Sequence, residues 1–153
     1  MKSLCLIAIS VLLSLAVHAA ENVFAICKVS ETEQPSMVRM TVESIAENPD
    51  NGKAFFVFTD KVLDEGDIAY ATTAQGNYYY RVVLQLTDAG KAKFAKFTRE
   101  SLGQRMGVLL NGKLFSVPVV RLEVTDGIIK SAPYLSKQDA EGIVAGLRKG
   151  QVK

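Results

Sequence analysis

The segment GVLLNGKL, residues 107–114, has residues that could bind the phosphates of a nucleotide. Its two glycines and its lysine match the phosphate-binding loop G-x-x-x-x-G-K-(Ser/Thr), in which backbone N–H groups and the lysine contact the phosphates. That chemistry requires a strand before the loop and a helix after it, because the first N–H groups of the helix point at the anion. It also requires a magnesium-binding hydroxyl, where this chain has Leu114.

The residues on either side of this segment predict a hairpin and no helix. Residues 106–110 are apolar, Asn111-Gly112 is the strongest two-residue hairpin signal, and residues 114–120 read as a second strand that contains Pro118. The lysine of the motif would then lie at the start of a strand. We therefore predict no nucleotide site and no cofactor.

The N-terminus has the features of a secretory signal peptide, assigned to residues 1–19. Met1-Lys2 precedes fourteen uncharged residues from Leu4 to Val17, and Val17-His18-Ala19 supplies the small residues of a cleavage site. The apolar run is shorter than a membrane span requires. We expect cleavage after Ala19 and a periplasmic or secreted protein that does not span the membrane. An uncleaved anchor is the alternative.

Loss of that leader would remove the only histidine and leave one cysteine, Cys27. Histidine-based triads, Cys–His pairs and His-ligated zinc would then be excluded. The S-x-x-K spacing of a serine–lysine dyad is absent from the sequence. Four acidic residues between Asp60 and Asp67 lack the ligand order of a calcium loop. We expect no catalytic residue and no metal site.

Cys27 has no intramolecular partner once the leader is removed. In an oxidising compartment it stays free or links two chains in a dimer. Lipid attachment would need small residues before it, where the chain has Phe24-Ala25-Ile26. The charge is balanced as well: the chain has 18 basic and 16 acidic residues, and loss of Lys2 leaves 17 basic ones. Such a balance predicts no nucleic-acid partner.

Hydrophobic periodicity divides the rest of the chain into elements. Residues 20–36 are polar and unpatterned, which predicts a flexible N-terminal arm, and residues 37–153 are expected to form a single domain. Thr87 and Ser136 have the side chains of helix N-caps, before helices that end near Leu102 and Gly150. Strands are predicted at 37–46, 54–58, 77–86, 106–110, 114–120 and 128–131, with a helical turn within 63–71.

This order of elements predicts an α+β fold, an antiparallel sheet with two amphipathic helices covering one face. The other face of the sheet would stay available. In the strand at 77–86, alternation places Tyr78, Tyr80 and the following even-numbered residues inward. Tyr79 and Arg81 then face outward.

Three segments resemble the head subdomain of the large periplasmic domain of SecD, a membrane subunit of the bacterial Sec protein-export machinery. They are VVLQLTDAGKAKFAKFT (82–98), GQRMGVLLNGKLFSVPVV (103–120) and SKQDAEGIVAGLRKG (136–150). With KVLDEGDIAYA (61–71), the resemblance covers about residues 60–150. Its most specific points are Leu86-Thr87, Gly90, Thr98-Arg99-Glu100, Gly103, Arg105, Gly112-Lys113, Ser116, Pro118 and Val119.

The resemblance implies a SecD-head-like fold, here as a standalone secreted protein, with no catalytic residues to carry over. Gly103 and Gly112 would lie in turns, and Pro118 would lie at an edge or bulge position of a strand. Pro133, in SAPYL, departs from the family pattern, so it leaves the pairing of the last strand open.

Two functions follow from these expectations. The first is a non-enzymatic periplasmic module that binds polypeptide, accessory to protein export. Tyr79 and Arg81 on the outward row, with Phe115 and Pro118 on the hairpin strand, would offer a face or an edge for an added strand. The second is an interaction or inhibitor module for one folded envelope protein.

Overall fold

The computed structural model describes residues 23–43, 48–131 and 135–151 of the chain. The predicted leader and Pro133 lie outside these ranges. The elements are β1 Phe24–Ser30, β2 Met37–Thr41, β3 Ala54–Asp64, the 3-10 turn η1 Glu65–Asp67, β4 Ile68–Gln75, β5 Tyr80–Leu86, α1 Asp88–Glu100, β6 Met106–Leu110, β7 Lys113–Ser116, β8 Ile128–Lys130 and α2 Lys137–Gln151.

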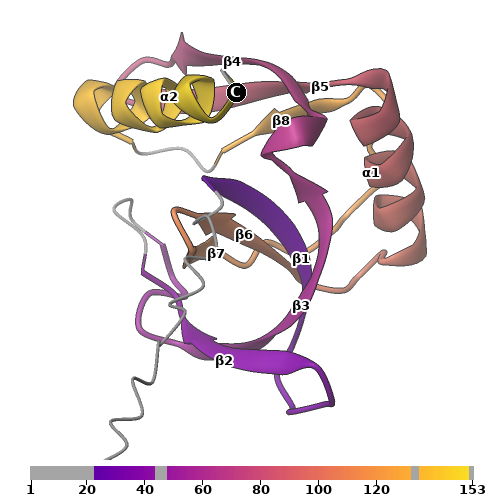
Figure 1. Cartoon of the computed structure of the whole chain (residues 1–153). Helices are drawn as coiled ribbons and strands as arrows, with labels where there is room; N and C mark the ends of the chain where they lie inside the picture. The colour runs from indigo at the N-terminus through magenta and orange to yellow at the C-terminus, as the bar shows by residue number, and fades with distance from the viewer. Residues whose placement is uncertain (1–22, 44–47, 132–134, 152–153) are drawn as a thin grey trace, which may run out of the picture.

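The strands form two antiparallel sheets and not the single sheet that the sequence predicts (Figure 1). The five-stranded sheet has the order β2-β3-β1-β6-β7, and the three-stranded sheet has the order β4-β5-β8. The chain passes from the first sheet to the second at η1. Asp64 accepts the N–H of Gly66 at 2.9 Å, and its own N–H donates to the Asp67 carboxylate at 3.2 Å. This reciprocal cap ends β3 and turns the chain.

The predicted flexible arm at residues 20–36 is wrong for residues 24–30, which form β1. β1 is the central strand of the five-stranded sheet, paired with β3 on one side and β6 on the other. Its first four residues, Phe24 to Cys27, are each at most 3% exposed. Phe24 and Ile26 enter one core, and Ala25 and Cys27 enter another. A strand buried on both faces shows no alternation, which is why periodicity missed it.

The five-stranded sheet curls until its two edges meet, as the ring of strands in Figure 1 shows. The N–H of Glu43, just after β2, donates to the carbonyl of Leu114 in β7 at 2.9 Å. Lys113 binds the Glu43 carboxylate at 2.8 Å across the same junction. The inside of the curl holds a small core that includes Cys27, Phe55 and Leu114.

The hairpin predicted around Asn111-Gly112 is confirmed. Asn111 has φ 49° and Gly112 has φ 74°, which are the left-handed conformations of a two-residue hairpin turn. β6 pairs with β7 on either side of the turn, and β7 begins at Lys113. Because a strand follows the lysine, the geometry of a phosphate-binding loop is absent here.

Helix α1 begins at the predicted N-cap and is fixed against η1. The Thr87 hydroxyl accepts the N–H of Gly90 at 3.1 Å, and the N–H of Thr87 donates to the carbonyl of Asp67 at 2.9 Å. A Cβ at Gly90 would lie 2.7 Å from that carbonyl oxygen, so only glycine fits here. The Asp67 side chain binds Lys93 at 2.8 Å.

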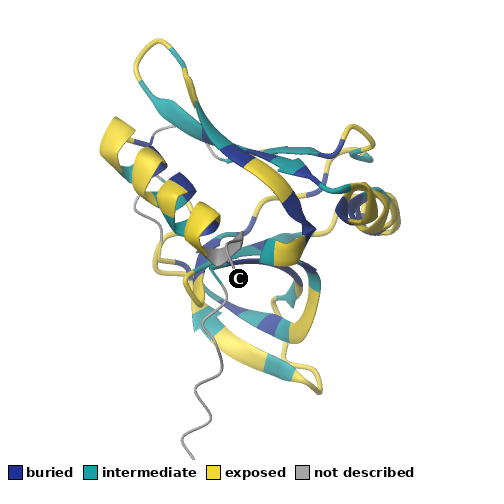
Figure 2. Cartoon of the chain, turned by 45° about the horizontal axis from the view of Figure 1, so that its top comes forward, coloured by how far each residue is buried: buried dark blue, intermediate teal, exposed yellow. Residues whose placement is uncertain are grey.

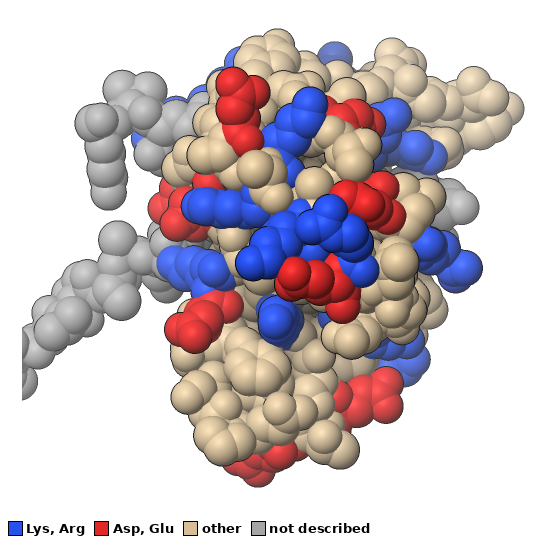
Figure 3. Space-filling model, turned by 90° about the vertical axis from the view of Figure 1, so that its right-hand side faces the viewer, with Lys and Arg blue, Asp and Glu red and all other residues tan. Residues whose placement is uncertain are grey.

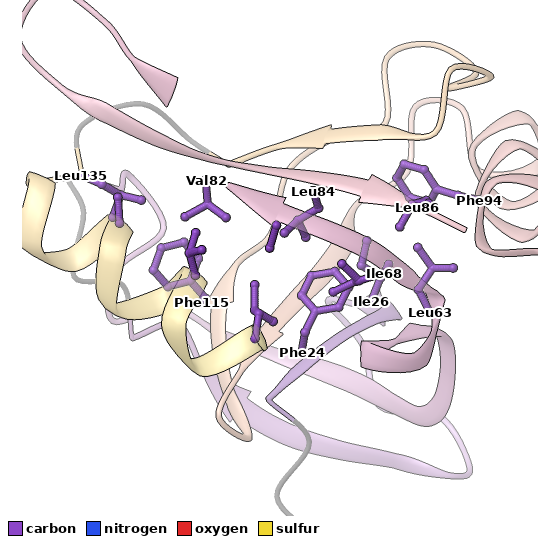
Figure 4. Packing of buried hydrophobic residues seen from close by; sticks show 14 of the residues in the cluster. Phe24, Ile26, Leu63, Ile68, Val82, Leu84, Leu86, Phe94, Phe115 and Leu135 are labelled. Atoms are coloured by element: carbon purple, nitrogen blue, oxygen red, sulfur yellow. The ribbon is translucent and has the colours of Figure 1, made fainter. Parts of the chain in front are cut away.

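The larger core lies between the two sheets, and both helices contribute to it (Figures 2 and 4). Val82, Leu84 and Leu86 face it from β5, as the alternation predicts, while Tyr78 is 99% exposed in the turn before β5. α1 and α2 lie on opposite sides of the space between the sheets (Figure 1). This differs from the predicted pair of helices on one face of one sheet. The buried residues that the helices contribute to this core are Phe94, Phe97, Ala140, Val144 and Leu147.

Candidate functional site

A pocket of about 690 Å³ opens between the two sheets on the side where α2 packs. Its volume lies within the range of ligand pockets, about 300–1,000 Å³. Both sheets and α2 supply its walls, so the pocket is the part of the larger core that side chains leave unfilled. The apolar walls include Phe24, Val82, Val108, Phe115, Ile129 and Leu147.

A polar cluster centred on Asp50 forms part of the mouth of this pocket. The Asp50 side chain is 12% exposed, and its carboxylate binds Lys53 at 2.9 Å and Arg105 at 3.1 Å. The hydrogen bond from Lys53 and the charge of Arg105 hold the pKa of Asp50 below its ordinary value, against the effect of burial. Arg105 also donates to the carbonyl of Val117 at 2.9 Å. The cluster therefore joins the turn after β2 to the segment after β7.

The structure brings two of the four predicted binding residues together at this pocket. Phe115 is 7% exposed and forms part of the wall. Pro118 is exposed at the mouth, two residues beyond the end of β7. Its carbonyl accepts the N–H of Met106 at 2.9 Å, and its missing N–H leaves no donor unpaired in the sheet.

The other two predicted residues, Tyr79 and Arg81, lie elsewhere and contact each other. Arg81 alternates with the buried residues Val82 and Leu84, so it faces away from the core of the three-stranded sheet. Its Nη2 donates to the Tyr79 hydroxyl at 3.0 Å, and its guanidinium carbon lies 5.1 Å from the centre of the tyrosine ring. Neither residue lines the pocket.

Sequence reasoning missed the basic residues around the mouth. The residues around Asp50 and Lys53 predict only a turn. Arg105 matches the pattern of the SecD head, where it has no assigned binding role. Asp50 and Arg105 are 55 positions apart, and a contact at that separation leaves no signal in one sequence. The one signal in the sequence is the polar turn at residues 48–52, which predicts that this side of the pocket lies near the surface.

The basic side chains of α1 form a mixed surface. Figure 3 views the molecule from the α1 side and shows Lys and Arg atoms interspersed with Asp and Glu. Lys93 binds Asp67, and Arg99 approaches Glu123 at 3.4 Å. Within the described residues, no three Asp, Glu, His or Cys side chains gather closely enough to hold a metal ion.

Cys27 is buried in the small core, with 3% of its surface exposed. Burial raises the pKa of its thiol, and the nearby charge of Lys61 opposes that shift only in part. A thiol that is both buried and protonated reacts slowly. This placement opposes the disulfide-linked dimer that the sequence allowed.

No helix in the parts of the chain that the structure describes combines the length and the apolar character needed to cross a bilayer.

Fold and pocket together define an α+β domain in which two antiparallel sheets and two helices enclose an apolar pocket. The chain belongs to the family described as SecDF, P1 head subdomain, whose model matches residues 40–153. This confirms the resemblance to the SecD head found in the sequence.

Relatives of known name agree with this assignment. The chain is 32% identical over 72 residues to the protein translocase subunit SecDF of Thermus thermophilus, which is 47% of this chain and 10% of that protein. It is 32% identical over 87 residues to the protein translocase subunit SecD of Sebaldella termitidis, 54% of this chain and 21% of that protein. The chain thus spans a small part of each relative.

Solved structures show the same fold. A structure of SecDF, described as a membrane component that enhances protein export, superposes with a TM-score of 0.59 at 19% identity. The match covers 81% of this chain and 62% of that one. SecDF in a super-membrane-facing form gives the same TM-score and identity, with 18% of its chain covered.

Proposed function

We propose that this protein is a non-enzymatic, polypeptide-binding module of the periplasm, accessory to protein export. The observation that carries the proposal is the apolar pocket between the two sheets. Membership of a family whose named relatives are protein translocase subunits supports the link to export. The proposal includes removal of residues 1–19, release from the membrane and folding of the rest as one domain.

An unfolded polypeptide offers the apolar side chains that such a pocket can bury. Burial of one Leu, Ile or Phe side chain is worth about 1.5–3 kcal/mol. Two such side chains therefore bring about 3–6 kcal/mol, from which the cost of immobilising the segment must be subtracted. The net gain is therefore smaller than this sum, and we expect a dissociation constant no tighter than the millimolar range, which corresponds to about 4 kcal/mol. A segment bound this weakly dissociates rapidly, so the polypeptide is not retained.

Phe115 and Pro118 would contact the bound segment at the wall and the mouth of the pocket. Tyr79 and Arg81 would provide a second contact on the outer face of the three-stranded sheet. Their mutual hydrogen bond orders the guanidinium before a partner arrives. The mouth would bind the polar backbone of the segment, and the interior its apolar side chains.

Amide NMR shift mapping with an unfolded secreted polypeptide tests this function. We expect shifts of residues that line the pocket, such as Val108 and Ile129, and unchanged signals from α1. Phe115→Ala should weaken binding, and Lys96→Ala, an exposed position on α1, should leave it unchanged. Absence of any shift at millimolar polypeptide would remove the proposal.

The pair Tyr79–Arg81 also favours a second function, binding of one folded envelope protein to the outer face of the three-stranded sheet. An Arg held over an aromatic ring is a common anchor of protein interfaces. In that case Arg81→Ala would abolish a stoichiometric complex, and Phe115→Ala would leave it intact.

A further inference from the structure

The mouth of the pocket carries an excess of positive charge. Among the residues that the structure describes, its charged lining residues are four basic side chains and one carboxylate. The whole chain has a formal net charge of only +2, so the basic residues are concentrated here. They are Lys53, Arg105, Arg121 and Lys130.

The one carboxylate among the described lining residues, that of Asp50, already forms ion pairs. Asp50 binds both Lys53 and Arg105, and Arg105 also lies 4.0 Å from the exposed carboxylate of Glu31. Arg121 and Lys130 are exposed, and neither belongs to any ion pair among the described residues. Within that part of the chain, these two cations at the mouth therefore face solvent without an acidic partner.

Positive charge at the mouth should make the pocket bind some segments of an unfolded polypeptide more tightly than others, according to their charge. The apolar walls cannot hold a charged side chain without a desolvation penalty. A carboxylate next to the apolar side chains would instead stay at the mouth, near Arg121 and Lys130. A lysine or arginine in the same place would be repelled.

We propose that the pocket takes segments of unfolded polypeptide in which apolar residues are flanked by acidic ones. The apolar side chains enter between the two sheets, and the flanking carboxylates lie against Arg121 and Lys130. This inference rests on the proposed function and names the class of polypeptide that the site prefers.

Three synthetic peptides test the inference on the purified protein. They share one apolar stretch, Leu-Val-Phe-Leu, and differ only in flanking residues, which are Glu, Gln or Lys. At low ionic strength, we expect the Glu-flanked peptide to bind about five- to tenfold more tightly than the Lys-flanked one, as two exposed ion pairs would give. The difference should shrink in 0.5 M salt because mobile ions screen exposed charges.

A pair of double variants locates the effect. Arg121→Gln with Lys130→Gln should remove most of the preference for the Glu-flanked over the Lys-flanked peptide, and an unchanged preference would contradict the inference. As a control, Lys91→Gln with Lys96→Gln also removes two positive charges, but from α1, which does not line the pocket. This variant should keep the preference for the Glu-flanked peptide. Circular dichroism confirms that both variants fold.

Each other outcome has a distinct meaning. Equal affinity for all three peptides would overturn the charge preference and leave the proposed function standing. No binding of any peptide at millimolar concentration would overturn both. Binding of decanoate, an anionic amphiphile, without binding of peptides would assign the pocket to a small ligand and contradict the inference.

Discussion

The two ends of the larger core differ in how they are closed. At the α1 end, Phe94 and Phe97 fill the space beside Leu63 and Leu86, and no residue of α1 lines the pocket. At the α2 end, Ile143 and Leu147 face a space of about 690 Å³ that side chains do not fill. One hydrophobic cluster thus contains a closed end and an open end.

The attachment of the helices follows the same division. Backbone and side-chain contacts to Asp67 fix the start of α1, and Gly90 allows the close approach. Among the described residues, α2 is held mainly by apolar side chains and by Arg148, which donates to the carbonyl of Ala71 at 3.0 Å and lies 5.7 Å from the centre of the Tyr70 ring. The α1 end is thus closed by packing and hydrogen bonds, and the α2 end holds the pocket to which the proposed function assigns binding.

The largest expected effect is at the closed end. Phe94 is 2% exposed and packs at 6.4 Å, centre to centre, from the Phe97 ring. Phe94→Ala should lower the free energy of unfolding by about 3–5 kcal/mol, because it removes a buried ring and leaves a cavity. Urea denaturation measures this. A loss below about 1 kcal/mol would show that the α1 end is not tightly packed.

The same substitution at the open end should cost less. Phe115 is nearly as buried, at 7% exposed, but part of its surface borders the pocket and not other atoms. Phe115→Ala therefore loses fewer packing contacts and should cost about 2–3 kcal/mol. Urea denaturation beside Phe94→Ala gives the comparison. Equal losses for the two variants would contradict the contrast between the ends.

Two glycines test how the helices are attached. Gly90→Ala should destabilise by about 1–3 kcal/mol, since its Cβ would lie 2.7 Å from the Asp67 carbonyl oxygen. A methyl group added at Gly142 in α2 would have no neighbouring atom within 4 Å, and Gly142→Ala should stabilise by up to about 1 kcal/mol through helix propensity. Thermal unfolding of both variants measures the signs. If both variants were destabilised, or both stabilised, the proposed difference between the attachment of α1 and that of α2 would be contradicted.

The smallest expected effect concerns the mouth and depends on pH. The pKa of Asp50 is lowered in the folded state, so the carboxylate stabilises the fold at pH values above its ordinary value of about 4. That contribution is lost as the pH falls through the lower, folded-state pKa. Asp50→Asn should therefore show a smaller loss of stability than the wild type between pH 5 and about pH 2. Identical pH profiles in urea denaturation would contradict this.

Local signals in the sequence predicted most of the elements. Asn111-Gly112 fixed the hairpin, and the caps at Thr87 and Ser136 placed both helices, with the Ser136 hydroxyl accepting the N–H of Asp139 at 3.1 Å. These features depend on residues close together in the chain. Their geometry can therefore be inferred from residue types alone.

The arrangement of those elements was not predictable in the same way. β1 lacks alternation because both of its faces are buried, so its polar surroundings were read as an arm. The division into two sheets depends on the cap formed by Asp64 and Asp67. The aspartate spacing is visible in the sequence, but the direction in which the chain leaves the turn is not. The pocket depends on contacts such as that of Asp50 with Arg105, which no local pattern contains.

The central claim is that unfolded polypeptide binds in the pocket between the sheets, and blocking the pocket tests it most directly. Val108 lines the pocket, and in protein that begins at Ala20, and so lacks Cys5, Val108→Cys can be labelled selectively with a bulky maleimide because Cys27 is buried and has a raised pKa. Lys96→Cys on α1, labelled in the same way, is the control. The account predicts that labelling at 108 abolishes binding of an unfolded secreted polypeptide and that labelling at 96 does not. Unchanged affinity after labelling at 108 would contradict it.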